Sequence, residues 1–138
     1  MLGEYKEEYL FPAIINKLAD DDYNVRFTDF EGIITCGENL EEAYFMAEDA
    51  LKLELFVLYS DKEEIPKATD INNIKISENE TLILVRVNLR NALKEYDNKS
   101  VKKTLTIPSW LNKIAEEENI NFSALLQNAI KDKIGINK

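Results

Sequence analysis

The order of apolar and polar residues predicts a three-stranded antiparallel meander near the N-terminus. Apolar residues fill YLFPAIIN at 9–16, alternate with polar residues through YNVRF at 23–27, and return at 33–36. Polar turns at 17–22 and 28–32 separate the three expected strands. Because proline donates no backbone hydrogen bond, Pro12 is expected to lie at a sheet edge or at a bulge.

A long helix is expected to begin after Asn39, which with Glu42 three residues later is close to a capping box. The expected apolar face of this helix is wide, so the helix should lie against the sheet. It comprises Leu40, Ala43, Ala47, Ala50, Leu51, Leu55 and Leu58. After this helix we expect three further segments: a charged connection at 60–80, a fourth strand at 81–89, and a polar linker at 91–100 with room for one helical turn.

The last third of the chain predicts a strand followed by two helices. In VKKTLTI, at 101–107, apolar residues hold three of the four odd positions and polar residues hold the even positions. Pro108 suits a helix start, and apolar residues at helical spacing predict helices near 109–120 and 123–134, with Trp110 packed in a core and Gly135 as a stop. One strand and two helices cannot close a core, so a second copy is expected to complete it.

Charge divides the chain at the same place, near Asn98. The net charge is −9; residues 1–98 hold 10 Lys and Arg against 22 Asp and Glu, giving −12, and residues 99–138 hold 7 against 4, giving +3. This asymmetry indicates separate partners for an acidic body and a small basic tail. The start of the chain lacks a signal-peptide pattern and no apolar run could span a bilayer, so we expect a cytoplasmic protein.

Composition argues against catalysis. The chain has no histidine, and its single cysteine, Cys36, is expected to be a small buried residue in a strand rather than a nucleophile. Asp20, Asp21 and Asp22 could gather a divalent cation for a nuclease, but aspartates are also common turn residues, and that interpretation is preferred. We therefore expect no catalytic residues, no metal site and no cofactor.

Residues 101–135 resemble a ribbon-helix-helix DNA-binding domain, in which two chains pair their strands into an antiparallel ribbon. The resemblance implies that Lys102, Thr104 and Thr106 face base edges. It also implies that the start of the last helix holds a DNA phosphate, with Asn121 and Ser123 as the candidate residues and simple helix capping as the alternative.

The N-terminal sequence adds a second resemblance. The spacing F-x-D-x-x-G-x-x-T-x-G, formed by Phe27, Asp29, Gly32, Thr35 and Gly37, together with the C-terminal pattern, resembles HicB-type antitoxins over nearly the whole chain. The resemblance implies an α+β fold: a partial RNase H-like antiparallel sheet with one long helix at 1–98, including a linker from about 90, and a dimerising ribbon-helix-helix at 99–138.

The same resemblance implies the function and the partners. It implies binding and neutralisation of a HicA-type toxin, a small basic mRNA interferase, and repression of the protein's own operon by a dimer that holds operator DNA, with larger assemblies left open. From their position at the sheet edge and turn, Phe27, Asp29, Phe30 and Glu31 are the candidate toxin contacts. Two alternatives stay open: a ribbon-helix-helix regulator whose acidic domain senses a ligand or protein, and a metal-dependent nuclease.

Overall fold

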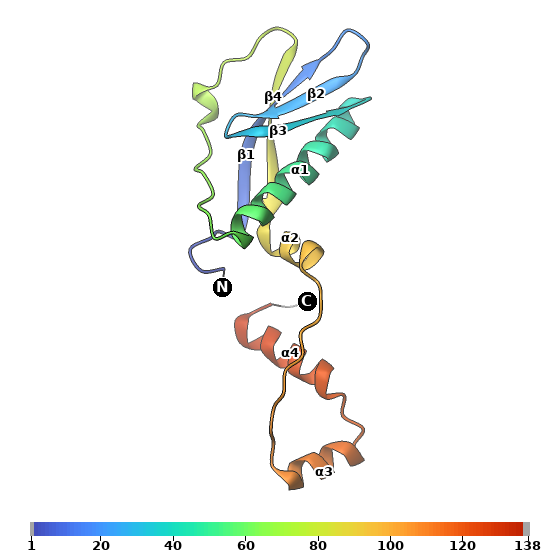
Figure 1. Cartoon of the computed structure of the whole chain (residues 1–138). Coiled ribbons are helices and arrows are strands. Elements are labelled where there is room, and N and C mark those ends of the chain that lie inside the picture. Colours follow the sequence, from blue (N-terminus) through green and yellow to red (C-terminus); the bar gives the residue numbers. More distant parts are fainter. Residues whose placement is uncertain (1, 137–138) are drawn as a thin grey trace. The chain divides into compact units, whose positions relative to one another are not determined.

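The computed structural model describes residues 2–136 and divides the chain into two compact units, Leu2–Asn98 and a C-terminal unit that begins at Lys99. The N-terminal unit holds four strands and two α-helices, and the C-terminal unit holds two further helices (Figure 1). The expected α+β class is confirmed.

The sheet of the N-terminal unit is antiparallel throughout, with strand order β3-β2-β1-β4. The first three strands form the predicted meander: β1 spans Glu8–Lys17, β2 Tyr23–Phe27 and β3 Phe30–Gly37. The second turn is shorter than predicted, since Phe27 already pairs with Phe30 across Thr28 and Asp29. Strand β4, Glu80–Asn88, returns after the helix and pairs with the other side of β1.

Pro12 does not lie in an edge strand, because β1 is an inner strand that pairs with both β2 and β4, but it does lie where β1 pairs only with β4, so the predicted edge position holds locally. The reason that proline is tolerated lies in the unequal strand lengths. Pairing with β4 extends along β1 to Glu8, whereas pairing with β2 ends at Ala13 opposite Phe27. Pro12 therefore lies one residue beyond the last β1–β2 pair, where a missing amide hydrogen breaks no bond to β2.

Helix α1, Leu40–Ser60, crosses one face of the sheet and covers the core. Asn39 caps it as predicted: its side-chain oxygen accepts a hydrogen bond from the amide of Glu42 at 2.8 Å. The Glu42 carboxylate accepts in turn from the amide of Glu38 at 3.2 Å, one residue earlier than in a standard capping box. Gly37 permits the tight connection, since a Cβ there would lie 2.4 Å from the backbone nitrogen of Ala43.

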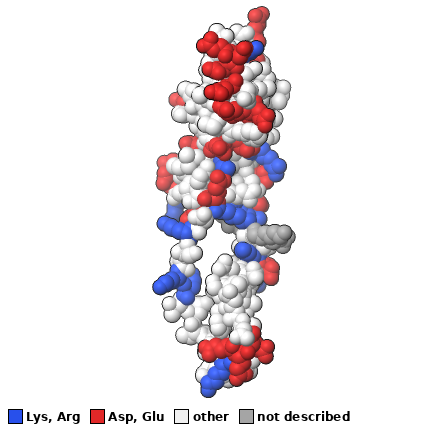
Figure 2. Space-filling view, turned by 90° about the vertical axis from the view of Figure 1, so that its right-hand side faces the viewer, with Lys and Arg blue, Asp and Glu red and all other residues white. Residues whose placement is uncertain are grey.

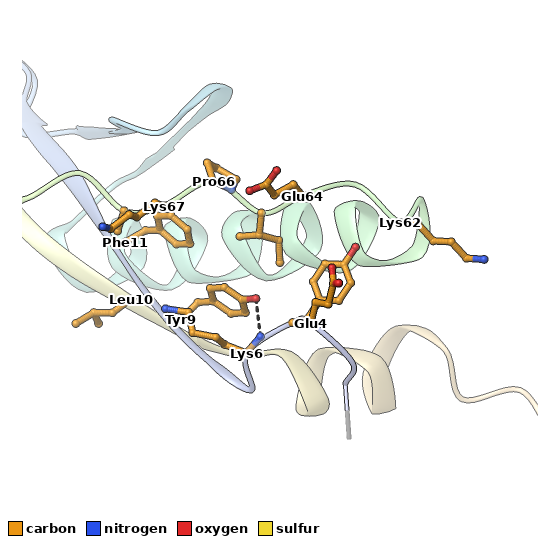
Figure 3. A pocket seen from close by; sticks show the side chains of 12 residues that line it. Glu4, Lys6, Tyr9, Leu10, Phe11, Lys62, Glu64, Pro66 and Lys67 are labelled. Carbon is orange, nitrogen blue, oxygen red and sulfur yellow. Dashed lines mark hydrogen bonds between the residues drawn. The ribbon is translucent and has the colours of Figure 1, made fainter.

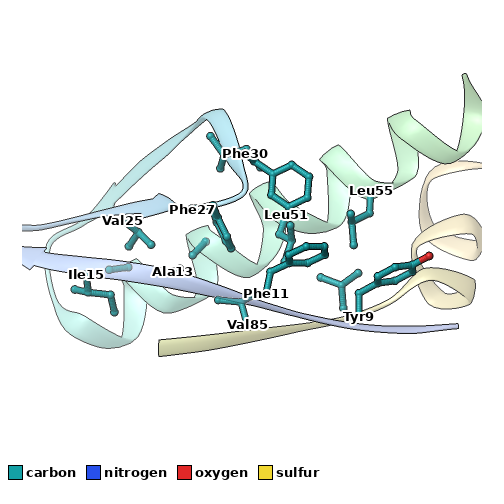
Figure 4. Close-up of a cluster of buried hydrophobic side chains, with 14 of the residues drawn as sticks. Tyr9, Phe11, Ala13, Ile15, Val25, Phe27, Phe30, Leu51, Leu55 and Val85 are labelled. Atoms are coloured by element: carbon teal, nitrogen blue, oxygen red, sulfur yellow. The ribbon is translucent and has the colours of Figure 1, made fainter. Parts of the chain in front are cut away.

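The core lies between α1 and the sheet (Figure 4). Aromatic side chains from β1, β2 and β3 meet there, and the Phe11 and Phe30 rings pack edge to face with centroids 4.8 Å apart. Residues that repeat every four positions along α1 close the core from above. These residues, none of which has exposed surface, are Ala43, Ala47, Leu51 and Leu55.

The connection from 61 to 79 is extended except for a short 3-10 turn, Ile71–Asn73. After β4, the predicted linker instead forms a two-turn helix, α2, Leu89–Tyr96, which begins on the cap of Asn88. Its Leu89 and Ala92 are fully buried, so this helix belongs to the N-terminal unit and lies against α1. The sequence at 91–100 has the composition of a polar linker because Ala92 is the one buried residue in this range.

The C-terminal unit contains α3, Ser109–Glu117, and α4, Phe122–Ile134, close to the predicted limits. Gly135 ends α4 in a left-handed conformation with φ 81°, as predicted. Residues 101–107 are extended but are not assigned to a strand, because the single chain offers them no partner strand. Trp110 was predicted to lie in a core, yet in the single chain it is 64% exposed.

We predict that two leucines on α1 will respond very differently to truncation. Leu51 is fully buried, whereas Leu53 is 49% exposed. Leu51→Ala should lower the free energy of unfolding by about 2–5 kcal/mol, because it leaves a cavity under the helix. Leu53→Ala should change it by less than about 1 kcal/mol. Urea unfolding of both variants tests the packing, and similar losses would contradict it.

Candidate interaction surfaces

The β2–β3 turn carries the predicted contact residue Asp29, which the structure assigns to an internal anchor. Its carboxylate accepts hydrogen bonds from the amide of Thr69 at 3.1 Å and from the hydroxyl of Thr69 at 2.5 Å. The pair lies partly buried and joins residues 40 positions apart. Asp29 therefore fastens the extended connection to the hairpin, and its hydrogen-bonding capacity is largely used within the chain.

The other predicted contact residues of this hairpin are divided between core and surface. Phe27 and Phe30 are 4% and 7% exposed and belong to the core cluster, so neither ring is available to a partner without unfolding the hairpin. Glu31 is exposed. Of the four residues, the structure leaves Glu31 as the one with a fully accessible side chain.

A groove of about 510 Å³ lies between the first half of β1 and residues 62–68 of the connection (Figure 3). It exists because β2 stops at Phe27 and leaves this half of β1 paired only with β4. Tyr9 and Phe11 face it, and the Tyr9 hydroxyl accepts a hydrogen bond from the amide of Lys6 at 2.9 Å. Charges of both signs line the groove, namely Glu4, Lys6, Lys62, Glu64 and Lys67.

The sheet face opposite α1 carries exposed apolar side chains and two ion pairs, with Ile34 paired to Arg26 across β2–β3 and Leu10 to Arg86 across β1–β4. Ile34 is 75% exposed and Leu10 51%. Arg86 binds Glu8 through contacts of 2.8 and 3.0 Å, and Arg26 binds Glu80 at 2.6 Å. Hydrogen bonds from Arg86 and then Asn88 lower the pKa of Glu8, but the pair is exposed, so it adds little to stability.

Cys36 also differs from its prediction. It was expected to be buried, but it is exposed on β3, the strand at one edge of the sheet. The cause is strand alternation, because the neighbouring residue Gly37 takes the position that faces α1. The aspartates at 20–22 are exposed at the tip of the β1–β2 turn, and within residues 2–136 no three potential metal-ligating side chains converge.

A surface that the sequence analysis did not single out lies on the outer side of α1. Its members share high exposure and an apolar character; they are Phe45, Met46, Leu53 and Val57. The available signal was that large apolar residues share the outer side of α1 with Glu41, Glu42 and Asp49, where a purely polar face would be expected. We refer to the four apolar residues as the outer stripe of α1.

In the C-terminal unit the predicted DNA-facing residues Lys102, Thr104 and Thr106 are all exposed in the extended segment before α3. None of the described residues of this unit is buried. Its exposed large apolar side chains come from the extended segment and from both helices, and they include Val101, Leu105, Trp110, Leu125 and Ile130. This unit lacks a core of its own.

At the start of α4, Asn121 and Ser123 have different roles. The Asn121 side chain accepts a hydrogen bond from the amide of Ala124 at 3.0 Å, which confirms its predicted capping role. Ser123 lies inside the first turn, where its hydroxyl accepts from the side-chain amide of Gln127 at 3.1 Å. Contact of either residue with phosphate stays a prediction.

Residues 11–130 match the family model of the HicB-like antitoxins of bacterial toxin-antitoxin systems. The chain belongs to this family. This HicB-like antitoxin is also 30% identical, over 103 residues, to an uncharacterized 14.9 kDa protein from the rep-hol intergenic region of Haemophilus phage HP1 (strain HP1c1). That match covers 74% of this chain and 75% of the phage protein.

Solved structures show the same fold. A chain of the toxin-antitoxin complex from Streptococcus pneumoniae is 30% identical and superposes with a TM-score of 0.60, covering 91% of this chain and 99% of that one. The Burkholderia pseudomallei antitoxin HicB is 21% identical with a TM-score of 0.53, over 88% and 96% of the two chains. Antitoxin HicB3 is 21% identical with a TM-score of 0.51, over 91% and 98%.

The family match supports the predicted HicB resemblance, while the ribbon-helix-helix pairing and the dimer stay predictions. None of the helices described in residues 2–136 is long and apolar enough to span a membrane.

We predict that the Asp29–Thr69 anchor contributes measurably to stability. Asp29→Ala should lower the free energy of unfolding by about 1–3 kcal/mol, because it removes two charge-assisted hydrogen bonds. Glu31→Ala, its exposed neighbour, should stay within about 0.5 kcal/mol of the wild type. A double-mutant cycle with Thr69→Val measures the coupling, and strictly additive losses would show that the two side chains do not act as a pair.

Proposed function

We propose that this HicB-like antitoxin neutralises a HicA-type toxin, a small basic mRNA interferase, through residues 1–98. We further propose that it represses its own operon as a dimer through residues 99–138. The observation that carries the proposal is the contrast between the two units. One has a closed core and a net charge of −12, and the other has no buried residue among those described and a net charge of +3.

The charge of the N-terminal unit supports the toxin role. A small toxin that cleaves RNA must itself attract a polyanion, so its RNA-binding surface is expected to be basic. An acidic partner competes for that surface and associates with it rapidly because the two potentials are complementary. The N-terminal unit has the charge expected of such a partner, with 10 Lys and Arg against 22 Asp and Glu in residues 1–98. Neutralisation by blocking that surface would require no catalytic residue in this chain.

The missing core of the C-terminal unit supports the dimer. Val101, Leu105 and Ile107 are 78%, 65% and 46% exposed, and they alternate with the polar residues of the same extended segment. Pairing this segment with a second copy would bury the apolar side and present the polar side outward as a two-stranded ribbon. Such a ribbon fits the major groove, where lysine and threonine can contact base edges.

Co-purification from the native locus tests the toxin role most directly, with the neighbouring reading frame left untagged. We expect a small basic protein to stay bound and its RNA cleavage to return when the two are separated. If no protein is retained while operator DNA still binds, the chain is a ribbon-helix-helix regulator with another partner for its acidic unit. Metal-dependent RNA cleavage by the chain alone, abolished by Asp29→Asn, would instead support a nuclease.

We predict that the polar face of the ribbon reads DNA. Thr104→Ala or Lys102→Ala should weaken operator binding by about 1–3 kcal/mol, as expected for a lost base contact, and should leave toxin binding intact. Lys75→Ala is the matched control for Lys102→Ala, because it removes the same charge from an exposed site in the N-terminal unit. An equal loss of operator affinity in this control would assign the effect to net charge alone.

We also predict that the two activities can be separated by truncation. A chain ending at Asn98 keeps every residue of the buried core and should still inhibit the toxin. It should lose operator binding and much of its self-association, because the extended segment and both C-terminal helices are gone. Gel shift and toxin inhibition measured on one preparation test this, and repression by the truncated chain would contradict the division.

A further inference from the structure

Helix α1 exposes several large apolar side chains on its outer side, although only its inner side packs on the sheet. A helix at the surface of a soluble protein normally has a polar outer face, and a helix that is apolar all round is normally covered on all sides. The inner side of α1 is fully buried in the core. On the outer side, Phe45, Met46, Leu53 and Val57 are 53%, 45%, 49% and 41% exposed.

Three members of the outer stripe form one row along the helix. Met46, Leu53 and Val57 are separated by seven and four residues, so they lie on the same side of the helix surface. Phe45 lies about a quarter of a turn away, with the exposed Asp49 between it and Leu53. Helix α2 covers only the flank of α1: Lys52 contacts Glu95 at 2.7 Å, and the Phe56 ring packs on Tyr96 with centroids 5.3 Å apart. Aromatic residues and methionine are also the types enriched at the centres of protein interfaces.

Acidic side chains surround the first half of this stripe. Glu38, Glu41, Glu42 and Asp49 are all exposed. Lys52, the basic residue of α1, is engaged by Asp49 at 3.6 Å and by Glu95. Figure 2 views the molecule from the side on which α1 lies in Figure 1, and it shows acidic side chains gathered on this face of the N-terminal unit.

The acidic residues around the outer stripe indicate which class of partner it can bind. DNA and anionic membranes would meet Glu41, Glu42 and Asp49 with like charge. The same stripe on a second copy would bring an identical acidic rim into contact, which is also unfavourable. A basic protein with an apolar patch at its centre satisfies both the exposed apolar residues and the acidic rim.

We propose that the outer stripe of α1 is the docking face for the toxin, with Leu53 near its centre and the acidic residues of the first helical turns forming its rim. This inference rests on the proposed antitoxin function and names the surface that performs it. It replaces the β2–β3 hairpin as the contact site, since the structure uses Phe27, Phe30 and Asp29 internally. The binding energy is assigned to the apolar stripe, and the rapid association to the acidic rim.

The test uses the full-length chain and the small basic protein encoded beside it. Leu53→Asp should raise the dissociation constant of the complex with the toxin at least about tenfold, as expected for a residue at the centre of an interface. Ile34→Asp is the matched control, because it makes the same change at a 75% exposed site on the opposite face of the sheet. It should leave the affinity unchanged. Since both variants add negative charge, attraction to a basic toxin cannot account for the loss.

A charge variant tests the rim separately. Glu41→Lys should slow association and reduce its dependence on salt, while changing the dissociation rate little, because rim charges act mainly on the encounter. Thermal unfolding and operator binding serve as checks that Leu53→Asp keeps the fold and the C-terminal unit intact.

The outcomes separate this inference from the proposed function. If the wild-type chain does not bind the neighbouring protein, the antitoxin proposal itself fails. If the wild type binds and Leu53→Asp binds equally well, the docking face is wrong while the antitoxin function stands. A loss of affinity in Ile34→Asp instead would move the interface to the open sheet face. Dissociation of a homo-oligomer by Leu53→Asp, with toxin affinity unchanged, would assign the stripe to a second copy.

Discussion

The close packing of helix α1 on the four-stranded sheet supports the whole N-terminal unit. Small residues make this packing possible: Ala43 and Ala47 carry no exposed surface, and the backbone of Gly37 approaches Ala43 so closely that no side chain fits between them. The aromatic rings of β1 and β3 can then meet beneath the helix, with Phe11 and Phe30 in edge-to-face contact. The Asp29–Thr69 anchor fastens the long connection to the same layer.

The C-terminal unit differs from the N-terminal unit because none of its described residues is buried. Its helices have well-formed ends, with Asn121 capping α4 and Gly135 ending it, but the apolar residues that these elements expose have no partner within the unit. The helix caps are therefore formed, but the apolar side chains of this unit are not buried. The proposed dimer supplies what is missing, and it would couple folding of this unit to the presence of a second chain.

The contrast between the two units is the physical basis for the two kinds of partner proposed for this chain. A self-sufficient acidic unit can bind a toxin as a preformed surface, at little cost in conformational entropy. The basic unit, if it pairs with a second copy as proposed, would bind DNA with two-fold symmetry. The outer stripe of α1 agrees with this proposal, because an apolar surface beside acidic residues suits a cationic protein and disfavours nucleic acid, the partner proposed for the C-terminal unit.

The sequence by itself determined the local structure: the meander, the long helix from Asn39, the fourth strand and the two C-terminal helices, because periodicity, caps and turn residues act over a few neighbours. The tertiary structure decided which strand is central, so Pro12 lies in an inner strand whose partner stops one residue short. It buried Phe27 and Phe30, placed Cys36 on the surface and used Asp29 as an anchor, because strand order and long-range contacts do not follow from local patterns. It also left the apolar residues of the outer stripe of α1 exposed, because which side of a helix is covered depends on how the helix packs.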